Sequence, residues 1–477
     1  ETSSIARAMS KSASTQNGGA PKANGAASNG VKAAASAESE PEWEFGGPWG
    51  VLGIMLFSHG LIYYCWICLT YYEGGVVYPA GLSDVVPFFQ RMGEHIVAGA
   101  WPTWYATKIY WAFLAFEAFL QYVCPGVVVK GLPLKHEGNK QLEYNCNALW
   151  AWYLTLGLWV YFQWSGVFPW STLMHHYGPL LTVSVLSGNL ISVLTYAVTI
   201  LLGRQYRMSG NVVYDFFMGA PLNPRIGSLD LKMFAEIRIS WMLLFFLTTS
   251  CAAYMYEVHG VVSWPILFLC LAHGLYTNAC MKGEECIPST WDIFYEKNGW
   301  MLIFWNFAGV PFVYCFQSVY LAKVAGPIEH STPYTVFLYC VLICAYYVWD
   351  TANSQKNHFR MQQQGTYVAR PMAFPQLPWQ TLKDPKYIKT ERGSLLLVSG
   401  WWKFARKIHY TADLCMSLCW GLICGFGSWI PFMYFAFFFT HLMHRAMRDM
   451  ERCAKKYGKD WEKYCQTVPW QFVPGIF

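Results

Sequence analysis

Long apolar runs recur along most of the chain and constrain its fold more than any other feature. A helix that crosses a membrane needs about 20 mostly apolar residues. By that rule the sequence predicts about ten such helices, near residues 48–71, 105–125, 147–167, 178–202, 239–257, 262–280, 300–321, 333–349, 411–426 and 428–444. The predicted fold class is all-α, a polytopic membrane helix bundle of about ten transmembrane helices.

The charged residues agree with a lipid environment and indicate an orientation. They make up 13% of the chain, whereas a soluble domain carries about 25%. Lysine and arginine gather after the second, fourth, sixth and eighth predicted helices. Because positive residues stay in the cytosol, we expect both termini to be cytosolic. The sequence contains no basic tract of the kind that binds nucleic acid. We therefore predict that the partner of this chain is the lipid bilayer and not a nucleic acid.

The first 45 residues differ from the rest of the chain. They are rich in Ala, Ser, Asn, Gly and Lys, and they contain no aromatic residue before Trp43. This composition predicts a disordered cytosolic tail over residues 1–45. Residues 46–477 then form the transmembrane domain.

Two polar constellations lie in loops beside the predicted helices. The first runs from Gly210 to Arg225 and continues to Lys232 and Glu236, which are spaced as an i,i+4 pair of opposite charge. The alternative for this segment is a loop that only orders two helix ends.

The second constellation runs from Lys282 to Tyr314 and brings acidic and phenolic groups to a membrane boundary. A pocket for an apolar ligand that also needs a proton donor requires such groups. Our candidate donors are Tyr314, Glu296 and Asp292. The alternative is hydrogen bonding between membrane helices.

The third constellation is basic and lies near the C-terminus. His441, Arg445, Arg448 and Arg452 step by four, three and four residues, which places them on one helix face. Arginine binds phosphates through two parallel hydrogen bonds, so this face, Arg448 included, is a candidate site for a phosphate-bearing cofactor. The alternative is an anchor on lipid head groups. We assign no metal site, because His441 and His444 lack an adjacent carboxylate motif.

Two of these segments resemble a known family. Gly210–Arg225, and the run from Leu442 through Arg445, Arg448 and Asp449 to Gly458, are similar to signatures of membrane sterol reductases. The resemblance covers residues 46 to 477. Within the family, Lys282–Pro288, Asp292–Lys297 and Phe304–Phe312 are most similar to the fungal branch that reduces the C24–C28 double bond of sterols.

The resemblance implies a cofactor, a substrate and a location. It implies NADPH bound by residues 350–477, and reduction of ergosta-5,7,22,24(28)-tetraenol to ergosterol in a multi-pass protein of the endoplasmic reticulum membrane. Other enzymes of sterol biosynthesis are further expected partners. Carried over by position, the cofactor contacts are Lys356, Arg360, Leu397, Trp402, His409, Tyr410, Asp449, Cys453, Ala454, Lys455, Lys456, Tyr457 and Tyr464. Other branches typically have asparagine where this chain has His409.

Three alternatives to this function remain open at the level of the sequence. The first is reduction of the Δ14 or Δ7 double bond of a sterol. The second is a membrane methyltransferase, since some have a similar basic C-terminal helix. The third is a scaffold that keeps the fold without catalysis, although the tail is too short and featureless for a chromatin-reading domain.

Overall fold

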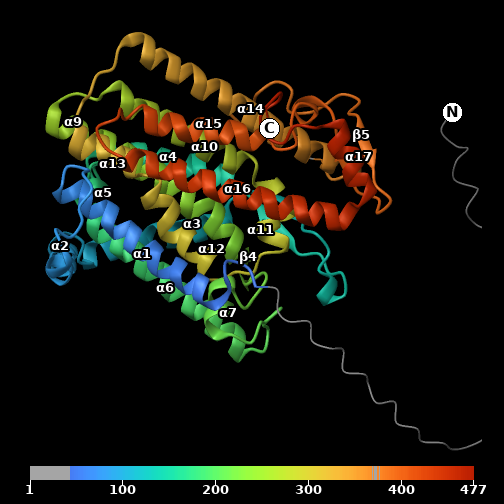
Figure 1. The fold of residues 1–477 in the computed structure, drawn as a ribbon, viewed down its shortest axis with the longest axis horizontal. Helices are drawn as coiled ribbons and strands as arrows, with labels where there is room; N and C mark the ends of the chain where they lie inside the picture. The colour runs from blue at the N-terminus through green and yellow to red at the C-terminus, as the bar shows by residue number, and fades with distance from the viewer. Residues whose placement is uncertain (1–42, 368, 370–372, 375, 477) are drawn as a thin grey trace, which may run out of the picture. The chain divides into compact units, whose positions relative to one another are not determined.

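The computed structural model describes residues 43–477 except 368, 370–372, 375 and 477. Glu44–Phe477 form one compact unit, built mainly from α-helices (Figure 1). Nearly all of the tail predicted over residues 1–45 lies outside the described residues.

Long helices make up the body of the unit. They are α1 (Gly47–Tyr71), α2 (Val85–Gly99), α3 (Trp104–Val123), α4 (Ala148–Ser165), α6 (Tyr177–Leu201), α9 (Trp241–His259), α10 (Trp264–Lys282), α14 (Thr332–Gln364), α15 (Ile408–Leu422) and α16 (Ile430–Tyr457). In Figure 1, α14, α15 and α16 run beside one another at one side of the unit. At one end of this group α14 and α16 end and α15 begins. We call this end of the bundle the charged end.

Short elements connect the long helices. The helical ones are α5 (Thr172–His175), α7 (Val212–Met218), α8 (Leu231–Phe234), α11 (Trp291–Phe294), α12 (Trp300–Phe304), α13 (Phe316–Tyr320) and α17 (Lys459–Thr467). The 3₁₀ turns are η1 (Leu82–Asp84), η2 (Lys135–Glu137), η4 (Glu284–Ser289) and η7 (Gly400–Lys403), and the π-helical turns are η3 (Ala235–Ser240), η5 (Trp305–Val313) and η6 (Leu321–Ala325).

The described residues also form three two-stranded antiparallel sheets, so the all-α prediction needs a small correction. β1 (Val127–Lys130) pairs with β2 (Glu143–Cys146), β3 (Arg225–Ile226) with β4 (Leu229–Asp230), and β5 (Tyr387–Lys389) with β6 (Leu395–Leu397). The strands satisfy backbone groups in connections between helices, where no helical ladder is available.

Five helical segments of the described chain are long and apolar enough to cross a membrane. They are Gly47–Tyr71, Tyr177–Leu201, Leu231–His259, Trp300–Ala325 and Thr332–Gln364. The count of about ten spans is therefore not confirmed. The other predicted spans coincide with helices that are too short, too polar or too charged for this criterion, namely α3, α4, α10, α15 and α16.

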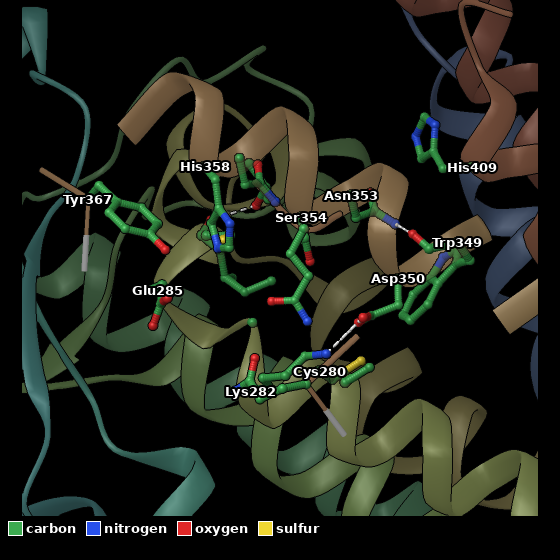
Figure 2. A pocket seen from close by; sticks show the side chains of 18 of the residues that line it. Cys280, Lys282, Glu285, Trp349, Asp350, Asn353, Ser354, His358, Tyr367 and His409 are labelled. Carbon is green, nitrogen blue, oxygen red and sulfur yellow. Dashed lines mark hydrogen bonds and ion pairs between the residues drawn. The ribbon is translucent and has the colours of Figure 1, made fainter. Parts of the chain in front are cut away.

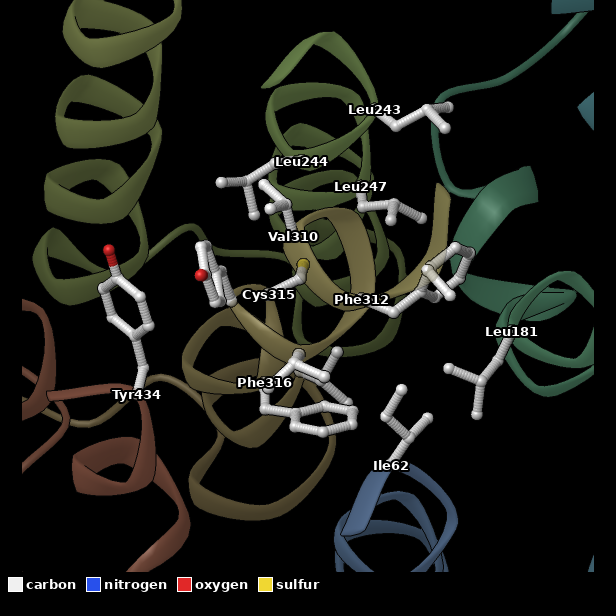
Figure 3. Packing of buried hydrophobic residues seen from close by; sticks show 14 of the residues in the cluster. Ile62, Leu181, Leu243, Leu244, Leu247, Val310, Phe312, Cys315, Phe316 and Tyr434 are labelled. Carbon is white, nitrogen blue, oxygen red and sulfur yellow. The ribbon is translucent and has the colours of Figure 1, made fainter. Parts of the chain in front are cut away.

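The apolar core surrounds the Trp300–Ala325 segment, which is the most deeply buried of the five. Phe312 and Phe316 of this segment pack among Ile62 of α1, Leu181 of α6 and Leu247 of α9 (Figure 3). Pro311 lies inside η5 and lacks a backbone N–H, which is one reason why the helix is not regular here.

A buried arginine, Arg238, holds four elements of the unit together. The Arg238 guanidinium lies 3.4 Å from a Glu117 carboxylate oxygen and 4.0 Å from Glu284, and it also donates to the Asn147 side chain. Arg238 and Glu117 are fully buried. Since an unpaired charge is very costly in such surroundings, this network fixes α3, α4, η3 and η4 relative to one another.

We predict that Arg238→Met strongly destabilises the unit, because it leaves the Glu117 carboxylate buried without its cation. Breaking a buried pair in this way costs about 3–5 kcal/mol. The matched control is Arg91→Met, since Arg91 pairs with Asp84 at 3.0 Å but is 45% exposed, and such surface pairs contribute about 0–1 kcal/mol. Thermal unfolding of the detergent-solubilised protein measures both, and equal losses would contradict the role given to Arg238.

Candidate functional site

The last long helix, α16, presents different chemistry on two of its faces. Arg445 donates to an Asp292 carboxylate oxygen at 2.9 Å, and Arg448 lies 3.4 Å from Glu296. Arg452 stacks on the Trp291 ring, 3.6 Å from its centroid. The shared face predicted for these arginines is therefore present, but it contacts the acidic and aromatic turn at residues 291–296. Arg448 also contacts Glu44, at 2.6 Å.

A neighbouring face of α16 lines a small cavity that we call the basic cavity. Its volume is about 130 Å³. Four cations and one carboxylate line it, together with aromatic and leucine side chains: Lys356, Phe359, Arg360, Leu395, Leu396, Leu397, Trp402, Arg406, Lys407, Asp449, Met450, Cys453, Tyr457, Trp461, Tyr464 and Gln471. Lys407 pairs with Asp449.

The wall of the basic cavity is fixed by the segment before α15. Gly400 has φ 62° there, and a Cβ on it would lie 2.2 Å from the Gln355 side-chain oxygen. The absence of a side chain lets Trp402 reach α14, where its indole donates to the Ala352 carbonyl at 2.8 Å. Lys356 then lies over the Trp402 ring, 4.0 Å from its centroid.

These residues fit a phosphate-bearing cofactor with a flat ring. Four cations against one carboxylate leave positive charge that an anion would neutralise. The Arg406 Nε atom is buried and finds no hydrogen-bond partner among the described residues. Trp402, Trp461 and Tyr457 offer faces on which an aromatic base can stack. The small volume suits one end of a dinucleotide.

A second, larger cavity lies between α10 and α14 and is called the long cavity here. Its volume is about 470 Å³, within the range of small-molecule sites. It is lined by Ala279, Cys280, Lys282, Gly283, Glu285, Cys286, Ile287, Thr290, Trp349, Asp350, Asn353, Ser354, Asn357, His358, Tyr367, Ala369, Gln376, Gln380 and His409. Figure 2 shows Lys282 paired with Asp350, at 2.8 Å.

The two cavities adjoin at His409. This side chain lines the long cavity, and its ring centroid lies 5.0 Å from that of Trp402, which lines the basic cavity. The His409 Nδ1 atom is buried and finds no partner among the described residues. A ligand group at this junction can therefore hydrogen-bond to the imidazole.

A phenol and a carboxylic group lie behind Trp349 at the His409 end of the long cavity, although neither of them lines the cavity itself. The Tyr276 hydroxyl donates to Asp413 at 3.4 Å, and the Tyr276 ring stacks on Trp349 with centroids 4.5 Å apart. Trp349 itself lines the cavity. Such a pair can hold a proton close to a bound ligand. Sequence reasoning missed Tyr276, although a phenol in an apolar helix is the same signal that singled out Tyr314.

None of the three predicted proton donors lines either cavity, and each is held by other contacts. Tyr314 accepts a hydrogen bond from the Trp305 indole at 2.9 Å and packs on Tyr434. Glu296 accepts from the Trp291 indole at 2.5 Å. Burial by itself would raise the pKa of Asp292, but the Arg445 guanidinium holds that pKa below its ordinary value. Asp292 is therefore ionised at neutral pH and is a poor acid.

The predicted cofactor contacts divide into three groups. The residues on the basic cavity are Lys356, Arg360, Leu397, Trp402, Asp449, Cys453, Tyr457 and Tyr464. His409 lines the long cavity. Five predicted residues line neither of the two cavities: Tyr410, Arg448, Ala454, Lys455 and Lys456. Helical geometry explains Arg448 and Lys455, which point away from the face that carries Asp449, Cys453 and Tyr457. It does not explain Lys456, which is seven residues from Asp449 and so lies near that face.

The first two sequence constellations pack against each other and support the 291–296 turn. Lys232 donates to the carbonyl oxygens of Ile293 and Glu296, at 2.8 and 2.7 Å, which is a different role from the expected i,i+4 pair with Glu236. Gly219 has φ 103°, and a Cβ on it would lie 2.5 Å from the backbone of Asn298. The two loops can approach this closely only with glycine at this position.

Comparison with known proteins gives consistent matches over most of the chain. Residues 39–477 match the model of the family described as "Ergosterol biosynthesis ERG4/ERG24 family". The chain is 44% identical over 446 residues to the Delta(24(24(1)))-sterol reductase erg4A of Aspergillus fumigatus, covering 93% of this chain and 94% of the relative. It is 44% identical over 442 residues to the Delta(24(24(1)))-sterol reductase of Gibberella zeae, covering 91% of this chain and 73% of the relative. It is also 36% identical over 441 residues to the Delta(14)-sterol reductase of Dictyostelium discoideum, with 91% and 92% covered.

We predict that Lys297 makes the stability of the unit depend on pH. Burial lowers the pKa of Lys297 to about 8 from an ordinary value of 10.5. Between these two values the unfolded chain binds more protons than the folded chain, so this group makes stability rise with pH across that window. Between pH 7.5 and 10.5, the unfolding temperature of the wild type should rise more with pH than that of Lys297→Met. The same pH dependence in both proteins would contradict this role of Lys297.

Proposed function

This chain belongs to the ergosterol biosynthesis ERG4/ERG24 family, and we propose that it reduces the C24–C28 double bond of ergosta-5,7,22,24(28)-tetraenol with NADPH, giving ergosterol. The resemblance that the sequence motifs indicated is confirmed by the family match and by the fungal relatives named Delta(24(24(1)))-sterol reductase. Relatives named Delta(14)-sterol reductase are less similar, at 31–37% identity. This difference favours the side-chain double bond over a ring double bond.

One observation carries the proposal: a cation-rich, aromatic cavity adjoins a larger, longer cavity at His409. The first has the charge and ring surfaces for the adenosine and phosphate part of NADPH. The second has the volume for a sterol-sized ligand. A two-substrate reaction requires the reacting ends of both molecules to meet, and the junction at His409 is where these two cavities come together.

The reaction adds one hydride and one proton across the double bond. NADPH supplies the hydride when it is bound. The protein has to supply the proton, and the Tyr276–Asp413 pair lies under Trp349 at the end of the long cavity nearest the junction. We assign the proton to this pair in place of Tyr314, Glu296 and Asp292. The relay starts with Asp413 in its protonated form. The proton leaves the Tyr276 hydroxyl, the Asp413 carboxyl gives its own proton to the phenolate, and solvent later reprotonates Asp413.

The surroundings of the protein are part of the proposal. Five segments suited to crossing a membrane support a multi-pass protein, and we propose the endoplasmic reticulum as its location, with about ten membrane helices in all. The charged end and both termini then face the cytosol, where NADPH is available and where other enzymes of sterol biosynthesis can bind.

The direct test is sterol profiling by gas chromatography–mass spectrometry. Microsomes that contain this protein receive ergosta-5,7,22,24(28)-tetraenol with NADPH or without it. NADPH-dependent appearance of ergosterol is the expected result. Reduction of a Δ14 or Δ7 sterol in its place would keep the family and refute the proposed position. Transfer of a methyl group from S-adenosylmethionine would support a methyltransferase, and binding of NADPH without turnover would support a scaffold.

We predict that Tyr276→Phe and Asp413→Asn lower kcat by about 10²–10⁴-fold, the usual contribution of a positioned acid. The affinity for NADPH should not change, because neither residue lines the basic cavity. Tyr314→Phe is the matched control, since it removes the same atom from a buried phenol that packs on Tyr434, whereas Tyr276 stacks on Trp349 in the wall of the long cavity. An equal loss of kcat in the control would contradict the assignment of the proton to Tyr276 and Asp413.

We predict that Arg360→Gln weakens NADPH binding by about ten- to a hundredfold, because a hydrogen bond to a charged group contributes about 1.5–3 kcal/mol. Lys403→Gln is the control. Lys403 is an exposed cation of η7, next to Trp402 in the chain, and it does not line the basic cavity. Binding is measured by titrating the cofactor's fluorescence. An unchanged Kd for Arg360→Gln would remove the basic cavity as the cofactor site.

A further inference from the structure

We propose that the sterol lies lengthwise in the long cavity, with its side chain at the His409 end and its ring hydroxyl at the end formed by His358 and Gln380. This inference rests on the proposed function, since it takes the side-chain double bond as the reacting group. It adds the orientation of the substrate and names the residues that bind its hydroxyl group.

The long cavity extends along α14. The lining residues of this helix run from Trp349 to His358, which corresponds to about 13 Å along the helix axis at 1.5 Å per residue. Figure 2 shows His409 and Trp349 at one end, and Tyr367, His358 and Glu285 at the other. An elongated, rigid ligand can therefore bind in only two directions.

The chemistry at the two ends decides between these directions. The His409 end adjoins the basic cavity and lies over the Tyr276–Asp413 pair. Hydride and proton both have to reach the C24–C28 bond, so that bond must lie at this end. Because the bond is in the sterol side chain, the ring that carries the hydroxyl group then lies at the opposite end.

That opposite end has the groups to bind a hydroxyl. His358 lines it and is held by Thr381, whose side-chain oxygen lies 3.2 Å from the ring nitrogen Nδ1. The Gln380 Nε2 atom is buried beside it and finds no hydrogen-bond partner among the described residues. A sterol hydroxyl can accept a hydrogen bond from this amide. It would thereby satisfy a donor that is otherwise costly to bury.

The segment that carries Gln380 also contributes Tyr367, Ala369 and Gln376 to the lining of the cavity. The Phe374 amide donates to the Tyr153 hydroxyl at 3.2 Å, and the Phe374 carbonyl accepts from Asn278. These contacts tie the segment to α4 and α10. The hydroxyl group would consequently be enclosed by protein, so its hydrogen bond to Gln380 affects both affinity and the depth at which the sterol stops.

Photo-crosslinking tests the orientation without depending on turnover. Two sterol probes are bound to the full-length protein, one with a diazirine on the ring next to the hydroxyl and one with a diazirine near the end of the side chain. We expect the ring probe to label the peptides that contain His358 or Gln380. The side-chain probe should label those that contain Cys280 or His409. Excess substrate sterol should abolish both labels.

Exchanged labelling would overturn the orientation, and labelling of neither set would overturn the long cavity as the sterol site. Both outcomes are distinct from failure of the proposed function, which would appear as absence of NADPH-dependent ergosterol in the microsome assay.

A variant provides an independent readout. Gln380→Leu should reduce the preference in kcat/KM for the sterol over its analogue without the hydroxyl group by about fivefold, since one hydrogen bond contributes roughly 1 kcal/mol. The control is Gln362→Leu, an exposed glutamine of α14 that does not line the cavity. An unchanged preference in Gln380→Leu would contradict the assigned hydroxyl contact.

Discussion

The ion pair between Asp292 and Arg445 is the contact on which the charged end of the bundle depends. It joins the turn at residues 291–296 to α16 at 2.9 Å. The same helix presents Asp449, Cys453 and Tyr457 to the basic cavity on a neighbouring face. The turn also leads back to η4, whose Glu285 and Ile287 line the long cavity. One pair of charges therefore sets the position of elements that border both cavities.

Much of the remaining polarity in the unit is used in the same way. Lys232 binds carbonyl oxygens of the turn, Lys282 binds Asp350, and Arg238 binds Glu117. In apolar surroundings a charge without a partner is costly, so each of these contacts allows few alternative arrangements. The exception is the basic cavity, where four cations face one carboxylate. That imbalance separates the basic cavity from the structural pairs around it and supports our proposal that it binds an anionic ligand.

The sequence allowed a large part of this arrangement to be predicted. Apolar runs gave the positions of the long helices except α2, and helical spacing put Arg445, Arg448 and Arg452 on one face. It did not reveal what that face contacts, because the partners Asp292, Glu296 and Trp291 are distant in the chain and pair with it only after folding. Gln380 was missed for the same reason, because a single amide acquires meaning only when the tertiary structure places it beside a cavity. Tyr276 carried the same signal as Tyr314, a phenol in an apolar helix, and only the structure shows that it stacks on a residue of the cavity wall. The short strands escaped notice because segments of two to four residues carry no clear period.

The most direct test of the account is to trace the two hydrogens that are added to the sterol. The reaction is run once in ordinary water with NADPH deuterated at the transferred position, and once in heavy water with ordinary NADPH. In the first run we predict one deuterium, from the cofactor, at one carbon of the former double bond. In the second run we predict one deuterium, from solvent, at the other carbon. Tyr276→Phe should slow both incorporations equally, because both steps complete the same reduction. Deuterium from solvent at both carbons, or none from the cofactor, would contradict a site in which a cofactor hydride and a proton from Tyr276 and Asp413 meet at the same bond.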